Sequence, residues 1–335
     1  MRTRLLGGLA ALTLTATLAA CGTPPAPQTA SDPAASDPVA ATSAAPTPTP
    51  SPTPSVDPTA LKPGTNHSNA AAAYAYEAKD IQACLLVPQA SGSTPSAGAA
   101  SATATPGRTP TANRTASAAP EVAGTCPSDR KIVFLTLDDG PNDRITPKVL
   151  DALKEANAPA TFFYVANSTG LEGSDPQVTK RTIAEGHSID IHTYSHNYKY
   201  LYPGGRGNAE NILADREKAV ASIKKVLGDD YAVSGYRYPG GHMSWKNLDE
   251  SSRRLAAEGA YWLDWNAMNG DAEQSAPTSV EGQLSMVKRT MRESGNPNVV
   301  VLLMHDHLYA DLTVQAIPEI VSYYREQGYE FGVLN

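Results

Sequence analysis

The chain from about Asp129 onward predicts an α/β domain built on a parallel sheet. Short apolar runs rich in β-favouring residues alternate there with amphipathic runs of helical period. One of the later runs, 299–304, is apolar throughout, as in a strand buried on both faces. Alternating strands and helices imply parallel pairing, in either an open sheet or a barrel, and roughly 200 residues is a common size for such a domain.

Seven strands and six helices are expected in order along this domain. The first strand is the apolar run from Ile132 to Leu137, and amphipathic runs lie between the later ones. The predicted strands are 131–137, 159–165, 188–191, 232–236, 260–264, 298–304 and 329–334. The predicted helices are 144–156, 176–185, 208–227, 246–258, 279–294 and 313–326.

The first strand ends in two adjacent acids, Asp138 and Asp139, followed by Gly140 and Pro141. Successive side chains of a strand point to opposite faces, so the two carboxylates need a turn to reach one site. Paired carboxylates at the carboxyl end of a buried strand suit a metal site with an adjacent base. An Asx-turn that only closes the strand is the structural alternative.

Other predicted strands also end in residues that can carry chemistry. His192 and His196 follow the third strand at an i, i+4 spacing, which would place two imidazoles on one face of a helical turn. His187 precedes that strand and is interpreted as structural. One Asp and two His suit Zn²⁺ or a similar first-row ion and leave an acid and a His for proton transfer. The remaining strand ends carry Arg237, Asp264 with Asp271 beyond it, and His305.

These motifs resemble those of the polysaccharide deacetylases of carbohydrate esterase family 4, the NodB-homology domain. Segment 136–141 is similar to the family's first motif, Thr-Phe-Asp-Asp-Gly-Pro, and segment 192–196 matches the second, His-Ser/Thr-x-x-His. Segment 237–239 is similar to the third motif, and segment 303–305 to the fifth, Leu-x-His. The resemblance covers about Lys131 to Asn335 and implies a distorted (β/α) barrel of about seven parallel strands.

The resemblance also implies roles for the residues at the strand ends. Asp138 would be the catalytic base and His305 the acid. A divalent metal, Zn²⁺ or in its place Co²⁺ or a similar ion, would be bound by Asp139, His192 and His196.

Two further polar roles follow from the resemblance. Arg237 would hold Asp138 and keep it ionised near neutral pH. An Asp of the fourth motif would orient Arg237 or His305. Asp271 is the first candidate for this acid and Asp264 is the second.

The chain departs from the family pattern at two positions. Gly240 stands where the third motif has an aromatic residue, so the backbone N–H that donates to the oxyanion is retained but a wall of the groove changes. Ala272 follows Asp271 where a Trp would line the acetyl pocket, and Leu303 is expected as a second wall. The candidates to replace that Trp are Trp245, Trp262 and Trp265.

Residues 1–20 are expected to be a signal peptide. Arg2 and Arg4 precede an apolar run from Leu5 to Ala19, which is short for a membrane span. The run ends in small residues before Cys21, a pattern similar to a bacterial lipoprotein signal. It implies cleavage before Cys21 and a lipid anchor at the extracytoplasmic face of the cell membrane, and an ordinary signal peptide with a chance Cys is the alternative.

Residues 21–125 are expected to be a linker rich in Pro, Ala, Ser and Thr, with a short helical island near 68–89. The catalytic domain would occupy 126–335. Cys84 in the island and Cys126 at the domain edge could form a disulfide in an exported protein, or remain two thiols.

The expected activity is metal-dependent deacetylation of N-acetylglucosamine units in a cell-wall polysaccharide, peptidoglycan or a chitin-like glycan, with release of acetate. An O-acetyl esterase acting on xylan-type polysaccharide and a non-catalytic glycan-binding lipoprotein are the alternatives. The formal charge of −7 and the lack of a Lys/Arg cluster argue against a nucleic-acid partner. A monomer is expected.

Overall fold

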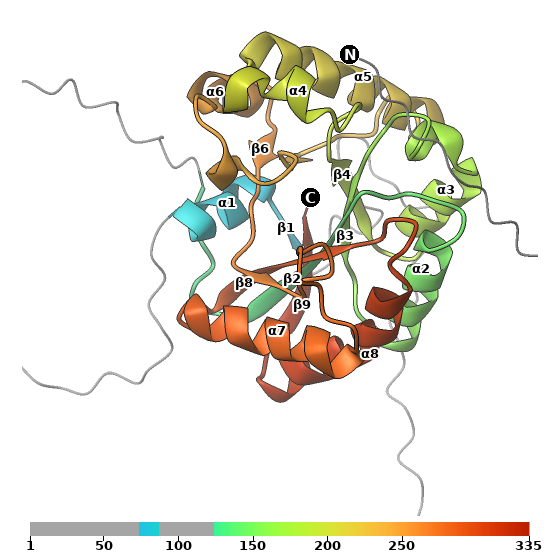
Figure 1. Cartoon of the computed structure of the whole chain (residues 1–335), viewed down its shortest axis with the longest axis vertical. Coiled ribbons are helices and arrows are strands. Elements are labelled where there is room, and N and C mark those ends of the chain that lie inside the picture. The colour runs from blue at the N-terminus through green and yellow to red at the C-terminus, as the bar shows by residue number, and fades with distance from the viewer. Residues whose placement is uncertain (1–73, 87–123, 335) are drawn as a thin grey trace, which may run out of the picture. The chain divides into compact units, whose positions relative to one another are not determined.

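In the computed structural model, residues 74–86 and 124–334 are described, and their strands form a parallel sheet that curls into a half-barrel (Figure 1). Seven strands follow one another along the curl, and every pairing between them is parallel. The predicted fold class is therefore confirmed. In spatial order these strands are β6 (Tyr261–Trp262), β5 (Gly235–Tyr236), β4 (Ser188–Ile191), β3 (Thr161–Tyr164), β2 (Ile132–Asp138), β8 (Val299–His305) and β7 (Ala267–Met268).

The central strand β2 determines where along the sheet the site residues lie. It pairs with β8 along its whole length, and this pairing ends with Asp138 beside His305. Its carboxyl half also pairs with β3, and its amino half pairs with a further strand, β9 (Glu330–Leu334). Because the strands are parallel, the loops after β2, β4, β5, β6 and β8 open at one end of the half-barrel, which we call the mouth.

Side chains of β2 alternate between two apolar clusters, as the period of a strand requires. Every second residue from Val133 to Leu137 belongs to the larger cluster, which includes the helices outside the sheet. Ile132 and Phe134 belong to a smaller cluster on the inner side. Thr136 and Asp138 continue this inner face. The buried carboxylate of Asp138 therefore follows the apolar residues of the same face.

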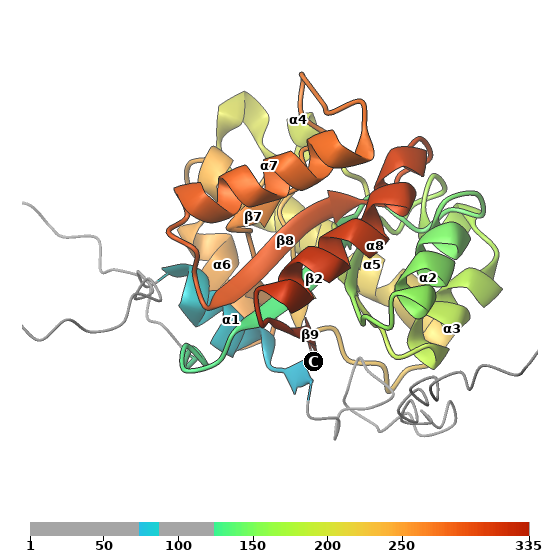
Figure 2. The same cartoon turned by 90° about the horizontal axis from the view of Figure 1, so that it is seen from below.

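Six long helices cover the outer face of the sheet, and each corresponds to a predicted helix. Figure 1 shows them arranged around the strands, and Figure 2 shows α7 and α8 over β8 and β2. The N-caps Asp175, Asn208 and Ser279 accept hydrogen bonds from backbone N–H groups, so three of the helices begin within a residue of the prediction. The helices are α2 (Thr146–Glu155), α3 (Pro176–Ala184), α5 (Ala209–Leu227), α6 (Asp249–Ala257), α7 (Val280–Glu293) and α8 (Asp311–Glu326).

Several short elements were not predicted, because segments of two to four residues are too short to show a period. They are β1 (Ala75–Tyr76), β7, α4 (Tyr198–Leu201) and the 3₁₀ turns η1 (Leu171–Gly173), η2 (Pro203–Gly205) and η3 (His242–Ser244).

The helical island expected near 68–89 contains a helix, α1 (Ala78–Leu86), that packs on the domain. The helix begins later than predicted because residues 75–76 pair with β9 as strand β1. Ile81 joins the inner apolar cluster, and the amide of Gln82 donates to the carbonyl of Trp262 at 2.8 Å. Among the described residues no pairing joins β6 to β7, and α1 lies beside β6 near this gap (Figure 1).

Cys84 of α1 and Cys126 form a disulfide. The structure thus decides between the two alternatives that the sequence left open. The bond and the inner cluster together attach the island to the domain edge.

The predicted signal peptide, the lipid site at Cys21 and most of the linker lie outside the described residues. Within the part of the chain that the structure describes, no helix has the length and apolar character needed to cross a membrane.

Candidate active site

The turn after β2 brings the two adjacent acids to the same mouth. Asp138 is the last residue of β2 and is buried, whereas Asp139 has a φ of 75° and turns the chain. Both carboxylates then face His192 Nε2, which lies 3.8 Å from Asp138 Oδ2 and 3.7 Å from Asp139 Oδ1. A Cβ on Gly140 would lie 2.2 Å and 2.4 Å from the carboxylate oxygens of Asp306, so this turn requires glycine.

The two histidines do not share a helical turn, so that part of the sequence interpretation is wrong. His192 follows β4 directly, and the loop after it has positive φ values at Thr193 (72°) and His196 (50°). Asp215 of α5 holds this loop, because its carboxylate accepts from two successive backbone N–H groups, the nearer being Tyr194 N at 2.5 Å. The loop still brings the imidazoles together, with their Nε2 atoms 3.2 Å apart.

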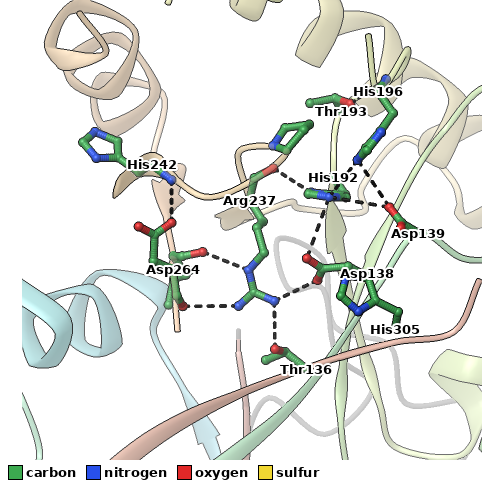
Figure 3. Close-up of polar contacts among 12 residues, drawn as sticks. Thr136, Asp138, Asp139, His192, Thr193, His196, Arg237, His242, Asp264 and His305 are labelled. Atoms are coloured by element: carbon green, nitrogen blue, oxygen red, sulfur yellow. Dashed lines mark hydrogen bonds and ion pairs between the residues drawn. The ribbon is translucent and has the colours of Figure 1, made fainter. Parts of the chain in front are cut away.

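Asp139, His192 and His196 form a group whose geometry fits one metal ion (Figure 3). Asp139 Oδ1 lies 3.7 Å from His192 Nε2 and 3.4 Å from His196 Nε2. Two ligand atoms at normal bond lengths on a tetrahedral zinc ion lie about 3.3 Å apart, so these spacings need little adjustment. His192 Nδ1 donates to the carbonyl of Arg237 at 2.9 Å, because a carbonyl only accepts, and this directs the Nε2 lone pair at the group. Burial and the neighbouring imidazole lower the pKa of His192 to about 3, which keeps it in the neutral form that binds metals.

Arg237 is fully buried and bonds to the first of the two acids. Its Nη1 atom donates to Asp138 Oδ1 and Thr136 Oγ1, both at 2.8 Å, and its Nε atom donates to the carbonyl of Leu263 at 2.9 Å (Figure 3). The guanidinium also lies over the ring of Phe163, 4.0 Å from its centroid. These contacts fix the guanidinium, which in turn fixes the Asp138 carboxylate.

Burial raises the pKa of Asp138 above its ordinary value, while the charges of Arg237 and His305 oppose this effect. Arg237 therefore acts in the direction expected from the sequence, but burial is the larger effect. The expectation considered only the neighbouring cation, because burial of the carboxylate is a property of the folded chain. A carboxylate whose pKa moves toward neutrality is the stronger base.

His305 pairs with Asp271, the first candidate for the fourth-motif acid. His305 Nδ1 lies 2.7 Å from Asp271 Oδ1, and Asp271 Oδ2 accepts from the backbone N–H of His305 at 2.9 Å. Burial alone would lower the pKa of His305, but the hydrogen bond and charge of Asp271 outweigh burial and raise it to about 9. Burial would raise the pKa of Asp271, but the charge and hydrogen bonds of His305 lower it. The pair therefore combines a protonated imidazole with an ionised carboxylate near neutral pH.

Asp264, the second candidate, has different partners. Its carboxylate accepts from the backbone N–H of His242 at 2.7 Å, and its carbonyl lies 3.4 Å from Arg237 Nη2 (Figure 3). The carboxylate also accepts from the backbone N–H of Met243 at 3.0 Å. It therefore fixes the turn after β5, and none of its described hydrogen bonds reaches His305.

Gly240 lies in this turn with a φ of 78°, a conformation that favours glycine. A Cβ there would lie 3.3 Å from the ring of Tyr198 and 3.4 Å from Trp245 Nε1. These two rings lie 5.5 Å apart, so they form a wall where the family usually has an aromatic residue after the proline. Of the three tryptophans considered as a replacement wall, Trp245 is the one beside Gly240.

The other two tryptophans lie near the same turn but farther along the chain. Trp262 is buried and stacks on the ring of His242 at 3.8 Å between centroids. Trp265 and Trp262 border a cavity of about 360 Å³ at the end of α1. Leu303, the predicted second wall, lies on the inner face of β8. His305 follows it by two residues and therefore lies on the same face.

Three residues that position the site were not singled out from the sequence. Asp215 holds the histidine loop, Thr313 donates to Asp271 at 2.7 Å, and the buried Asp306 packs under the turn after β2. Asp215 could have been found from the pattern alone, because it lies on the helix face that also carries the buried Ile212. A buried acid on an apolar helix face needs a partner.

The chain is similar in sequence and in structure to known proteins. The profile of the polysaccharide deacetylase family matches residues 126–258. The chain is 30% identical over 204 residues to a peptidoglycan-N-acetylglucosamine deacetylase of Bacillus cereus, covering 61% of this chain and 69% of that protein. It is 27% identical over 209 residues to a chitooligosaccharide deacetylase of Sinorhizobium fredii, covering 59% and 87% respectively. Among solved structures, a CE4 esterase of Streptococcus mutans is similar with a TM-score of 0.68 and 34% identity, covering 84% of this chain and 100% of that one.

Proposed function

Because the chain belongs to the polysaccharide deacetylase family, whose members hydrolyse amide bonds, we propose that it removes acetyl groups from N-acetylglucosamine units of a cell-wall polysaccharide and releases acetate. The names of the relatives from Bacillus cereus and Sinorhizobium fredii support peptidoglycan or a chitin-like glycan as the polymer. One observation carries the proposal. A group of one carboxylate and two imidazoles, a buried carboxylate–arginine pair and a carboxylate–histidine pair meet at one mouth.

The proposal includes a divalent metal held by Asp139, His192 and His196. Two imidazoles and one carboxylate favour Zn²⁺, with Co²⁺ or a similar ion as a substitute. When bound, such an ion would polarise the acetyl carbonyl and make a nearby water more acidic.

Asp138 acts as the base. Arg237 occupies Asp138 Oδ1, so the proton of the attacking water passes to Oδ2, the oxygen that faces His192 of the metal group. Because the guanidinium is itself held by Thr136 and by the carbonyl of Leu263, the carboxylate needs no reorientation before it accepts the proton.

His305 acts as the acid for the leaving nitrogen. Asp271 engages Nδ1, so the proton that reaches the leaving amine comes from Nε2. The N–H of Gly240, in a turn that Asp264 fixes, donates to the oxyanion formed from the acetyl carbonyl. Cleavage of the C–N bond then gives a free amine and acetate.

We further propose that the protein works at the extracytoplasmic face of the cell membrane through a lipid on Cys21. The apolar run that ends in small residues before Cys21 supports cleavage at that point. The Pro-rich stretch at 46–54 has the composition of a semi-rigid spacer between an anchor and a domain.

The deciding experiment is mass spectrometry of N-acetylglucosamine oligomers after incubation with the protein, with and without a chelator. We expect a mass loss of one acetyl group per event, equal release of acetate, and no reaction with the chelator until Zn²⁺ is restored. Acetylated xylan is the second substrate in the assay. Acetate from xylan but none from the amide substrates would replace the proposed activity with that of an O-acetyl esterase.

A further inference from the structure

The end of strand β6 holds the arginine that fixes the base, although the strand itself is only two residues long. The carbonyl of Leu263, directly after β6, accepts from Arg237 Nε at 2.9 Å, and the next carbonyl, that of Asp264, lies 3.4 Å from Nη2. Arg237 in turn donates to Asp138 Oδ1 at 2.8 Å. The position of this strand end therefore determines where the guanidinium and the base lie.

Strand β5 bonds to one edge of β6. The N–H of Tyr261 donates to the carbonyl of Ser234 at 2.8 Å, and the N–H of Leu263 donates to the carbonyl of Tyr236 at 2.9 Å. Because the backbone groups of successive strand residues point to alternate edges, those of Trp262 point to the opposite edge. Within residues 74–86 and 124–334, no strand pairs with that edge. A buried carbonyl there needs a donor from outside the sheet.

Gln82 of α1 supplies this donor. Its Nε2 atom donates to the carbonyl of Trp262 at 2.8 Å, and the side chain is only 7% exposed. Ile81, beside it, belongs to the inner apolar cluster together with Phe163, whose ring centroid lies 4.0 Å from Arg237 Cζ. The island therefore meets the surroundings of the arginine through one polar contact and through the apolar cluster.

The helix that carries Gln82 is itself fixed to the domain. Cys84 forms the disulfide with Cys126, and Asp80 Oδ1 accepts from the backbone N–H of Thr125 at 2.8 Å. The carbonyl that the amide holds comes one residue before the carbonyl that accepts from the arginine. Gln82 lies outside residues 126–258, which match the family profile, so the comparisons assign it no role.

We propose that Gln82 is a positioning residue of the active site, which acts through the end of β6 on Arg237. The proposal rests on the proposed function. Without the amide, the buried carbonyl of Trp262 loses its donor and the strand end is held by β5 alone, so the carbonyl of Leu263 shifts with it. A displaced guanidinium no longer fixes the base in its reactive position, which lowers the rate of the chemical step and leaves substrate binding nearly unchanged.

The first test compares the metal-loaded wild type with Gln82→Met, which keeps the length of the side chain and removes the donor. On the N-acetylglucosamine hexamer, kcat should fall about tenfold while KM stays within about twofold. In an Arg237→Lys background the same change should lower kcat by no more than about twofold, because Lys lacks the planar fork that the β6 carbonyls hold. Asp80→Ala is the matched control, since Asp80 bonds to Thr125 and should leave kcat unchanged.

The second test does not depend on activity. Hydrogen exchange of the Arg237 Nε–H is followed by NMR, and its signal is assigned by its absence from the Arg237→Lys protein. Exchange should be at least about tenfold faster in Gln82→Met than in wild type and unchanged in Asp80→Ala. Gln82→Asn, whose shorter side chain withdraws the donor, carries the same expectations and replaces Gln82→Met if that protein does not fold.

The two tests separate this proposal from the proposed function. If exchange is faster as expected but no protein releases acetate, the positioning by Gln82 stands and the deacetylation is rejected. An unchanged exchange rate overturns the positioning whatever the activity. In an active protein, an unchanged kcat, or an equal loss of kcat in the Arg237→Lys background, also overturns it.

Discussion

Replacement of Asp271 by Asn should move the basic limb of the pH–activity profile by at least about two pH units. Asp271 raises the pKa of His305 to about 9 against the opposing effect of burial. His305 donates a proton in the proposed reaction, so kcat/KM should fall as the pH rises through its pKa. Without the carboxylate, the hydrogen bond and the charge are lost while burial remains, and the pKa should return to its ordinary 6.5 or below.

The size of the effect follows from the two pKa values. At about pH 8 the protonated fraction of His305 falls from roughly 90% to roughly 3%, a loss of about thirtyfold. Below the pKa of the variant's imidazole both proteins keep most of their imidazolium, so the loss due to deprotonation nearly disappears there. A bound cation lowers both pKa values in the same direction, because it is present in both proteins, so the difference between them should remain.

The assay is acetate release from the N-acetylglucosamine hexamer across this pH range at low substrate concentration. Asp264→Asn is the matched control, because it also neutralises a buried acid near the mouth, but that acid bonds to His242 and Met243. It should lower activity through the Gly240 turn without moving the basic limb. A folded Asp271→Asn protein whose limb coincides with that of wild type would refute the pairing as the origin of the raised pKa.

Three other changes test the site and the island. Asp138→Asn should reduce acetate release at least about 100-fold and leave the bound metal unchanged by elemental analysis, since it removes the base and not a ligand. His196→Ala should lower the metal content and the metal-induced rise in melting temperature, and an unchanged metal content would reject His196 as a ligand. Replacing Cys84 and Cys126 by Ser should lower the free energy of unfolding by about 4 kcal/mol in urea titrations, given a separation of 42 residues, and an equal stability would mean that the inner apolar cluster alone holds α1.

The sequence predicted the strand-end residues well because each carries its own local signal. An apolar run followed at once by Asp138, by His192 or by His305 is visible without knowing the fold, and parallel pairing then brings such ends together. The family resemblance built on these motifs is confirmed. The helical turn proposed for His192 and His196 was wrong, because a spacing of four residues does not reveal that Thr193 and His196 adopt positive φ.

Residues that position the site from outside the motifs were harder to predict. Asp215 lies 19 residues after His196 on α5. Its place on an apolar helix face indicates that its carboxylate needs a partner, but not that this partner is the histidine loop. The choice between Asp271 and Asp264 likewise depended on which carboxylate reaches His305 across the mouth. The pKa of Asp138 depended on burial, which exists only when β2 is covered on both faces.

The sequence alone determined the order of strands and helices and the identity of the groups that meet at the mouth. Periodicity and local motifs depend only on residues that are neighbours in the chain. Only the tertiary structure decided which acid serves which histidine, that α1 is tied to the domain through Cys84 and Cys126, and that Gln82 bonds to the end of β6. Each of these depends on distances between residues that are far apart in the chain. Such distances are set by packing of the whole domain and not by any one segment.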